Sequence, residues 1–289
     1  MGRRDIEVLG LRTPLIETGP AEDDEAIVFL HGHPGSSRDW EGLMSRIDFG
    51  RAVAFDLPGL GKADKPDDWN YTIGTYATFV AAALDVLGVE RAHLVMHDLG
   101  GGAGLLWAAA HPDAFASAVI MGTGVLKNYD WHWLAAMQRR PFVGPLMVRL
   151  TNERGFRSTM RRAHRGSREL PEWFVDQLWE DYDLRSRRAM MEMYRGAPPG
   201  GFERLALIFR ELDRPALVVW GEKDPFVPAE QAQLQRESFP SAEVHVLEDS
   251  GHWPFIDNAD AAAARIIPFL REQLESGSRP RRGAARASA

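Results

Sequence analysis

Clusters of histidine, aspartate and glycine follow several of the short apolar runs in this chain. They occupy residues 31–36, 97–102, 221–225 and 249–254. Carboxylates and imidazoles are side chains that enzymes use for nucleophilic attack and proton transfer. In an open parallel sheet, ligands bind beyond the carboxyl ends of the strands, where such clusters would meet. We therefore expect the four clusters to form one catalytic site.

The apolar runs alternate with stretches of helical spacing along most of the chain. The expected strands are residues 6–9, 15–18, 26–30, 52–55, 93–97, 118–121, 216–220 and 244–247. Residues 75–87 repeat apolar side chains at helical spacing, which predicts a crossover helix with its apolar face in the core. This alternation is typical of an α/β fold with a mostly parallel sheet.

The pattern of alternating strands and helices stops at about residue 126 and resumes near residue 215. The sequence between these positions is rich in tryptophan, methionine and arginine, and its apolar residues have helical spacing. We predict a core of residues 1–123 and 201–275, with a helical cap inserted at 124–200. The remaining residues, 276–289, contain four arginines and no acid, and we expect a disordered basic tail.

Composition excludes several classes of site and partner. The chain of 289 residues has no cysteine, so it forms no disulfide, thiolate metal site or cysteine nucleophile. Its net charge of -7 argues against a nucleic-acid partner, which would need a basic face. Every apolar run is shorter than the roughly 18 residues of a membrane span, and the first residues lack the apolar core of a signal peptide. We expect a cytoplasmic protein without a membrane partner.

The segment Met96-His97-Asp98-Leu99-Gly100 resembles the nucleophile elbow of α/β-hydrolase fold enzymes, Gly-x-nucleophile-x-Gly. Asp98 stands at the position that usually holds serine, and Met96 replaces the first glycine. The resemblance extends over nearly all of the chain and is strongest to the aspartate-nucleophile group of epoxide hydrolases and haloalkane dehalogenases. It implies an eight-stranded, mostly parallel sheet flanked by helices with an inserted cap.

The resemblance also assigns the remaining catalytic roles. The family order of nucleophile, acid and histidine is matched by Asp98, Asp224 and His252. An aspartate is already ionised at neutral pH and can attack a saturated carbon to give an alkyl ester. His252, held by Asp224, would then activate the water that hydrolyses this ester. The backbone N–H groups of His33 and Leu99 would form the oxyanion hole.

Several of the polar residues in these clusters also have an interpretation without a catalytic role. Asp98 could cap the following helix, and Asp224, which precedes a proline, could be a turn residue. His31 and His33 could suggest a metal, but the sequence offers no clustered carboxylates beside them. We therefore expect neither a metal nor a cofactor.

The sequence leaves the identity of the leaving group open. Related haloalkane dehalogenases carry tryptophan after the nucleophile and haloacetate dehalogenases carry arginine, whereas this chain has Leu99. Epoxide hydrolases use cap tyrosines to protonate the departing oxygen, a role that Tyr194 and Tyr129 could take. His132 and Trp133 resemble the halide-binding pair of haloacetate dehalogenases.

We therefore predict a hydrolase that converts an apolar or bulky epoxide to a diol. Three alternatives stay open. The first is a dehalogenase that uses His132, Trp133 or Tyr194 to hold the halide. The second is an atypical ester, lactone or carbon–carbon bond hydrolase or lyase with Asp98 as base. The third is a non-enzymatic ligand receptor, because a fold alone does not fix function.

Nine arginines lie between residues 139 and 168, at positions 139, 140, 149, 154, 157, 161, 162, 165 and 168. They could steer an acidic substrate or a carrier protein to the cap, or they could form a solvated surface. The expected partner is a small apolar substrate, and a homodimer is compatible with the sequence.

Overall fold

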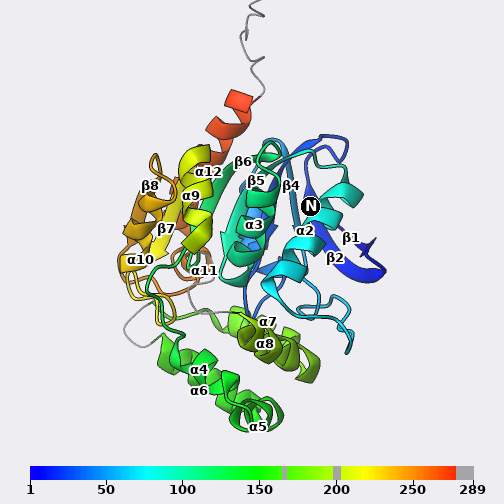
Figure 1. The fold of residues 1–289 in the computed structure, drawn as a ribbon, viewed down its shortest axis with the longest axis vertical. Helices are drawn as coiled ribbons and strands as arrows, with labels where there is room; N and C mark the ends of the chain where they lie inside the picture. Colours follow the sequence, from blue (N-terminus) through cyan, green and yellow to red (C-terminus); the bar gives the residue numbers. More distant parts are fainter. Residues whose placement is uncertain (165–167, 198–202, 278–289) are drawn as a thin grey trace, which may run out of the picture.

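The computed structural model describes residues 1–164, 168–197 and 203–277. Its centre is one eight-stranded sheet in the order β1-β2-β4-β3-β5-β6-β7-β8 (Figure 1). The strands are β1 (Gly2–Val8), β2 (Leu11–Thr18), β3 (Glu25–Leu30), β4 (Arg51–Phe55), β5 (Arg91–His97), β6 (Phe115–Met121), β7 (Ala216–Gly221) and β8 (Glu243–Leu247). The pairs β1–β2 and β2–β4 are antiparallel and the other five pairs are parallel, so the predicted eight-stranded, mostly parallel sheet is confirmed.

The central strands are covered on both faces, which explains their nearly continuous apolar sequences. All residues of β4 and β6 are buried, as are all but the first of β5. Helices α2 (Ile73–Leu87), α3 (Leu99–Ala110) and α9 (Glu203–Leu212) lie in front of the sheet in Figure 1. Helices α1 (Glu41–Met44), α11 (Pro254–Asp257) and α12 (Ala259–Gly277) contact one another, and α12 contacts β6 and β7. Such double coverage is typical of parallel sheets.

The predicted crossover helix at 75–87 is α2, which begins two residues earlier than expected. Thr72 caps it, since the side chain of Thr72 accepts a hydrogen bond from the amide of Thr75. The helix ends at Gly88, whose φ of 65° lies in the left-handed region that glycine adopts without strain. Its buried side chains are those that the spacing had placed in the core.

Six of the described helices lie between β6 and β7 in the chain, and we call the first five the cap: α4 (Trp133–Arg139), α5 (Val143–Leu150), α6 (Glu153–Ala163), α7 (Glu172–Asp181) and α8 (Leu184–Gly196). They lie together below the sheet in Figure 1, with α5 at the end of the molecule opposite α12. The short helices α10 (Glu230–Leu234), η1 (Ser37–Trp40) and η2 (Gln235–Glu237) complete the described elements. The domain boundaries at 123 and 200 stay predictions.

Two further predictions concern the ends of the chain and the membrane. Residues 276 and 277 of the predicted basic tail form the end of α12, and the rest of that tail lies outside the described residues. Within the described part of the chain, no helix is both long and apolar enough to cross a bilayer.

Candidate active site

Asp98 sits on a tight turn between the end of β5 and the start of α3. Its φ of 47° and ψ of -119° lie outside the regions that a non-glycine residue ordinarily adopts. Strain of this kind accumulates at functional positions, where the surrounding structure enforces it. Two glycines leave room for the turn. A Cβ on Gly32 would lie 2.4 Å from the Cβ of Asp98, and a Cβ on Gly100 would lie 2.2 Å from the carbonyl oxygen of Leu30.

Helix α3 makes room for Met96, the methionine that replaces the first glycine of the elbow motif. A Cβ on Gly104 of α3 would lie 2.6 Å from the sulfur of Met96. The absence of a side chain at Gly104 therefore makes the space that the buried Met96 fills. This compensation lies eight residues from Met96 in the sequence, so the elbow motif alone does not reveal it.

The structure brings Asp98, His252 and Asp224 together as the sequence predicted. Nδ1 of His252 lies 2.8 Å from Oδ2 of Asp224, and Nε2 of His252 lies 3.7 Å from Oδ2 of Asp98. Asp224 is fixed in turn by the amides of Phe226 and Val227, which donate to its Oδ1 over 2.8 and 2.9 Å. His252 thus bridges two carboxylates, one held by the backbone and one facing the cavity.

His97 holds the loop that carries His252. Nε2 of the buried His97 donates to the carbonyl oxygen of His252 over 2.9 Å, and the two rings lie 4.5 Å apart. Burial lowers the pKa of His97 to about 3, so the ring is neutral and serves as a donor. The elbow therefore positions His252 as well as Asp98.

The charges of the three residues follow from their mutual contacts. Burial alone would raise the pKa of Asp98, but the hydrogen bond and charge of His252 and the amide of His33 hold it below its ordinary value. Burial alone would lower the pKa of His252, but Asp224 and Asp98 together raise it to about 10. At neutral pH the resting site therefore contains an ionised Asp98 beside an imidazolium.

The predicted oxyanion-hole residues flank Asp98. The amide of His33 donates to Oδ1 of Asp98 over 2.9 Å. Leu99 is the first residue of α3, so its amide has no partner within the helix. Both amides are thus available near the carboxyl group, although the oxyanion-hole role itself stays a prediction.

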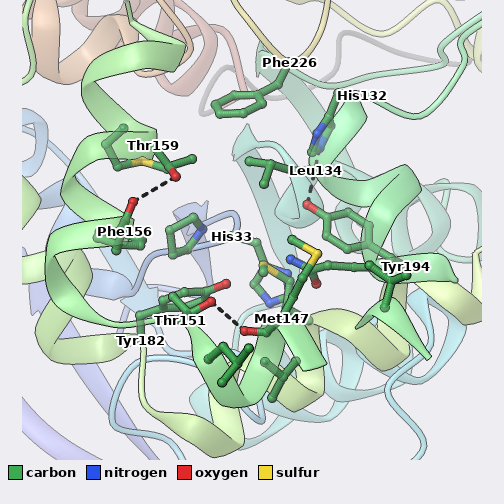
Figure 2. A pocket seen from close by; sticks show the side chains of 18 of the residues that line it. His33, His132, Leu134, Met147, Thr151, Phe156, Thr159, Tyr182, Tyr194 and Phe226 are labelled. Carbon is green, nitrogen blue, oxygen red and sulfur yellow. Dashed lines mark hydrogen bonds between the residues drawn. The ribbon is translucent and has the colours of Figure 1, made fainter. Parts of the chain in front are cut away.

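A cavity of about 370 Å³ opens above Asp98. Its polar side chains include Asp98 and His252, and most of the remaining surface is apolar and comes from the cap. Figure 2 shows three further polar residues of the lining, His33, His132 and Tyr194. The hydroxyl of Tyr194 lies 3.5 Å from Nε2 of His132. The ring nitrogens of His33 have no partner among the described residues, and burial lowers the pKa of His33 to about 3.

His132 is oriented so that it supports the tyrosine. It is the N-cap residue of α4, and its Nδ1 accepts a hydrogen bond from the amide of Ala135 over 3.4 Å. Burial lowers the pKa of His132 to about 4, so the ring is neutral and its proton is assigned to Nε2. Nε2–H then donates to the oxygen of Tyr194, which leaves the phenolic proton free for a substrate.

Two predicted substrate contacts are not brought to the cavity. The hydroxyl of Tyr129 donates to the carbonyl oxygen of Phe226 over 3.1 Å, and Tyr129 is absent from the cavity lining. Trp133 follows His132 at the start of α4, where neighbouring side chains point in different directions, and it is 55% exposed. Of the four predicted cap contacts, His132 and Tyr194 therefore line the cavity.

The sequence reasoning missed Phe226. Its ring lines the cavity and contacts both His252 and His132, with ring centroids 5.0 Å apart in each case. Phe226 follows Asp224 by two residues in the loop after β7, and that position is the only signal that could have identified it. The cavity is therefore closed on this side by an aromatic ring that packs against His252.

The histidine pair that could have suggested a metal has other roles. Nε2 of His31 accepts a hydrogen bond from the amide of Leu57 over 2.9 Å, and its Nδ1 donates to the carbonyl of Gly32 over 3.0 Å. Over the described ranges, no group of three or more histidine, aspartate or glutamate side chains could hold a metal ion. His31 thus shapes the loop that presents the amide of His33.

The raised pKa of His252 predicts how stability depends on pH. Because the folded pKa of about 10 exceeds the ordinary 6.5, the ion pairs stabilise the fold fully below pH 6.5 and less as pH rises toward 10. We expect this residue to contribute a fall in unfolding free energy of up to about 1.4 kcal/mol per pH unit in that window. Urea unfolding at pH 6 and pH 9 should show that the unfolding free energy of His252→Gln falls less between these two pH values than that of the wild type. Equal declines would contradict the assigned charge state.

The chain matches known proteins over most of its length. A family model described as alpha/beta hydrolase fold matches residues 25–259. A 2-hydroxy-6-oxononadienedioate/2-hydroxy-6-oxononatrienedioate hydrolase of Burkholderia vietnamiensis is 28% identical over 277 residues, covering 90% of this chain and 91% of the relative. A cis-3-alkyl-4-alkyloxetan-2-one decarboxylase of Shewanella oneidensis is 27% identical over 267 residues, covering 86% and 82%.

Among solved structures, haloalkane dehalogenases have a similar fold. The enzyme DbeA from Bradyrhizobium elkani superposes with a TM-score of 0.79 at 24% identity, covering 95% of this chain and 99% of that one. The enzyme DatA from Agrobacterium tumefaciens superposes with a TM-score of 0.78 at 24% identity, covering 94% and 97%. At this identity the likeness concerns the fold.

Proposed function

The chain belongs to the alpha/beta hydrolase fold family, and from this premise we propose that it is a hydrolase that opens an apolar epoxide through an ester on Asp98. The observation that carries the proposal is the ionised carboxylate at the elbow. Asp98 lines an apolar cavity, with His252 on one oxygen and the amide of His33 on the other. A carboxylate in this position needs no base before it attacks.

In the first step a carboxylate oxygen of Asp98 attacks a carbon of the three-membered ring. The carbon–oxygen bond of the ring breaks, and its electron pair stays on the departing oxygen. Tyr194 gives that oxygen its phenolic proton. Burial raises the pKa of Tyr194 well above its ordinary value, so the phenol is protonated at neutral pH until an alkoxide forms beside it. The product of this step is a hydroxyalkyl ester of Asp98.

Formation of the ester itself prepares His252 for the second step. The ester is neutral, so one of the two carboxylates that raise the pKa of His252 has disappeared. The imidazolium then releases its proton, which restores the phenol of Tyr194 through solvent. Neutral His252 takes a proton from water as the water attacks the ester carbonyl, and Asp224 stabilises the new imidazolium. When the tetrahedral intermediate collapses, the departing oxygen takes the remaining proton of the added water, so that the diol is released and the Asp98 carboxylate is restored.

Replacement of Tyr194 by phenylalanine tests the proton donor. Tyr194→Phe removes only the hydroxyl, so we expect formation of the Asp98 ester to slow by about 100-fold, the usual contribution of a positioned acid. Rapid-quench mass measurement in a single turnover would follow the ester. Tyr129→Phe is the matched control, because the hydroxyl of Tyr129 is bonded to a backbone carbonyl outside the cavity lining. An unchanged rate for Tyr194→Phe would contradict its role.

The alternative of a dehalogenase differs in the leaving group. A halide needs N–H donors near the attacked carbon, and no tryptophan is among the described residues that line the cavity. His33 and His132 remain as possible N–H donors. Release of free halide from an alkyl halide, with no turnover of epoxides, would favour this alternative over epoxide opening.

A second candidate, a carbon–carbon bond hydrolase or a lyase, is supported by the names of the two relatives described above, a 2-hydroxy-6-oxononadienedioate/2-hydroxy-6-oxononatrienedioate hydrolase and a cis-3-alkyl-4-alkyloxetan-2-one decarboxylase. In such a reaction Asp98 would act as a base and form no ester. Turnover in ¹⁸O-labelled water separates the two. An ester on Asp98 puts the label into its carboxylate after hydrolysis, whereas a base mechanism leaves Asp98 unlabelled.

A further inference from the structure

Helix α5 exposes three large apolar side chains on one face. Phe142, which caps the helix, is 89% exposed, Leu146 is 56% exposed and Leu150 is 66% exposed. Their spacing of four residues places them in a single row, which we call the α5 stripe. Within the described residues nothing covers this row. A contiguous exposed apolar surface of this kind usually marks an interaction site.

The α5 stripe is flanked by positive charge. Residues 139–162 contain seven arginines and one acid, Glu153, although the whole chain carries a net charge of -7. Arg140, Arg149 and Arg154 are exposed, and none of them forms an ion pair with a carboxylate of the described chain. Glu153 is itself paired with Arg157. The surface around the stripe therefore offers unpaired guanidinium groups to an anionic partner.

The stripe also lies at the mouth of the catalytic cavity. Leu146 and Leu150 are more than half exposed, and both line the cavity that contains Asp98. Side chains that face both the cavity and the solvent form its rim. Figure 1 shows α5 at the extreme end of the molecule, where the rim is free to meet a flat surface.

We propose that α5 docks on an anionic lipid bilayer, with the stripe inserted between the lipid headgroups and the arginines on their phosphates. An amphipathic helix with apolar and basic groups on its exposed side binds such an interface through both contributions. Apolar substrates dissolve in the bilayer and enter the cavity across its rim, a route that rests on the proposed function. The surface departs from the expectation of no membrane partner, which rested on the lack of a spanning segment.

Charge distinguishes the bilayer from a second copy of the chain. Two copies joined through this face would bring their unpaired arginines close together, which is unfavourable. An anionic bilayer instead neutralises them and also buries the three apolar side chains. An acidic carrier protein would match the arginines alone.

Co-sedimentation of the full chain with vesicles tests the proposal. Vesicles of phosphatidylcholine that contain about 30 mol% phosphatidylglycerol are compared with vesicles of pure phosphatidylcholine, each at low and at high salt. We expect binding to the anionic vesicles that weakens in high salt. Phe142→Glu and Arg149→Glu lie outside the cavity lining and should each reduce the partition coefficient at least about fivefold. Leu207→Glu on α9, which is 67% exposed, is the matched control and should bind as the wild type does.

No binding to anionic vesicles would overturn the proposal, and so would binding that Phe142→Glu leaves unchanged. A dimer in solution that Phe142→Glu dissociates, without vesicle binding, would assign the face to a second copy instead. Vesicle binding is measured without substrate, so its failure is independent of the proposed reaction. A circular-dichroism spectrum and a thermal midpoint equal to those of the wild type would show that Phe142→Glu is folded.

Discussion

Asp98→Ala is expected to lower kcat for an apolar epoxide by about four orders of magnitude, the loss typical of removing the nucleophile of a catalytic triad. The substitution removes the carboxylate that would form the ester, and no other carboxylate of the described cavity lining stands beside His252. The amide of His33 and the apolar walls remain, so substrate binding should change little.

Steady-state kinetics tests this prediction, and circular dichroism shows whether each variant is folded. The matched control is Asp113→Ala, which removes an exposed carboxylate just beyond the far end of α3. The control should keep the wild-type kcat. If Asp98→Ala were folded and its kcat lay within tenfold of the wild-type value, the nucleophile would have to be another group.

His252→Gln is expected to separate the two chemical steps. Glutamine can contact Asp224 but cannot accept a proton from water, so hydrolysis of the ester should slow by about a thousandfold or more. The attack by Asp98 needs no base, and the first turnover should therefore still occur. The time course should show a burst of epoxide consumption that is stoichiometric with enzyme, followed by a stall.

Rapid-mixing kinetics with a chromogenic epoxide measures both phases. His245→Gln on β8 is the matched control, since His245 lies on the strand that leads to the loop of His252 and its Nε2 lies 3.7 Å from Oε2 of Glu243. That variant should turn over normally. Equal losses of the burst and of the steady-state rate in His252→Gln would show that the histidine is needed before the ester forms.

The sequence predicted the arrangement of the sheet and the central site because both depend on local patterns. Apolar runs specify buried strands, and polar residues at the strand ends specify where the site lies. Asp98, Asp224 and His252 meet because parallel strands end at the same edge of the sheet. The space under Met96 was not predictable, because it depends on Gly104 in the neighbouring helix.

The cap contacts were harder to predict, because their orientation depends on where a helix begins. His132 caps α4 with its ring toward Tyr194, whereas the next residue, Trp133, points to solvent. Asn128 adopts a left-handed conformation in the loop before α4, and no sequence spacing specifies that bend. Phe226 was overlooked because its neighbour Asp224 explained the same loop. The positions of side chains that are carried by loops could be found only from the structure, whereas those at strand ends followed from the sequence.

The intact mass of His252→Gln after incubation with a panel of apolar epoxides and alkyl halides tests the central claim most directly. We expect a gain equal to the whole epoxide, located on the peptide that contains Asp98 and absent from the double variant with Asp98→Ala. A gain equal to an alkyl halide without its halogen would identify a dehalogenase. If the wild type turns over a panel epoxide and His252→Gln gains no mass, Asp98 does not form an ester and the proposed mechanism is contradicted.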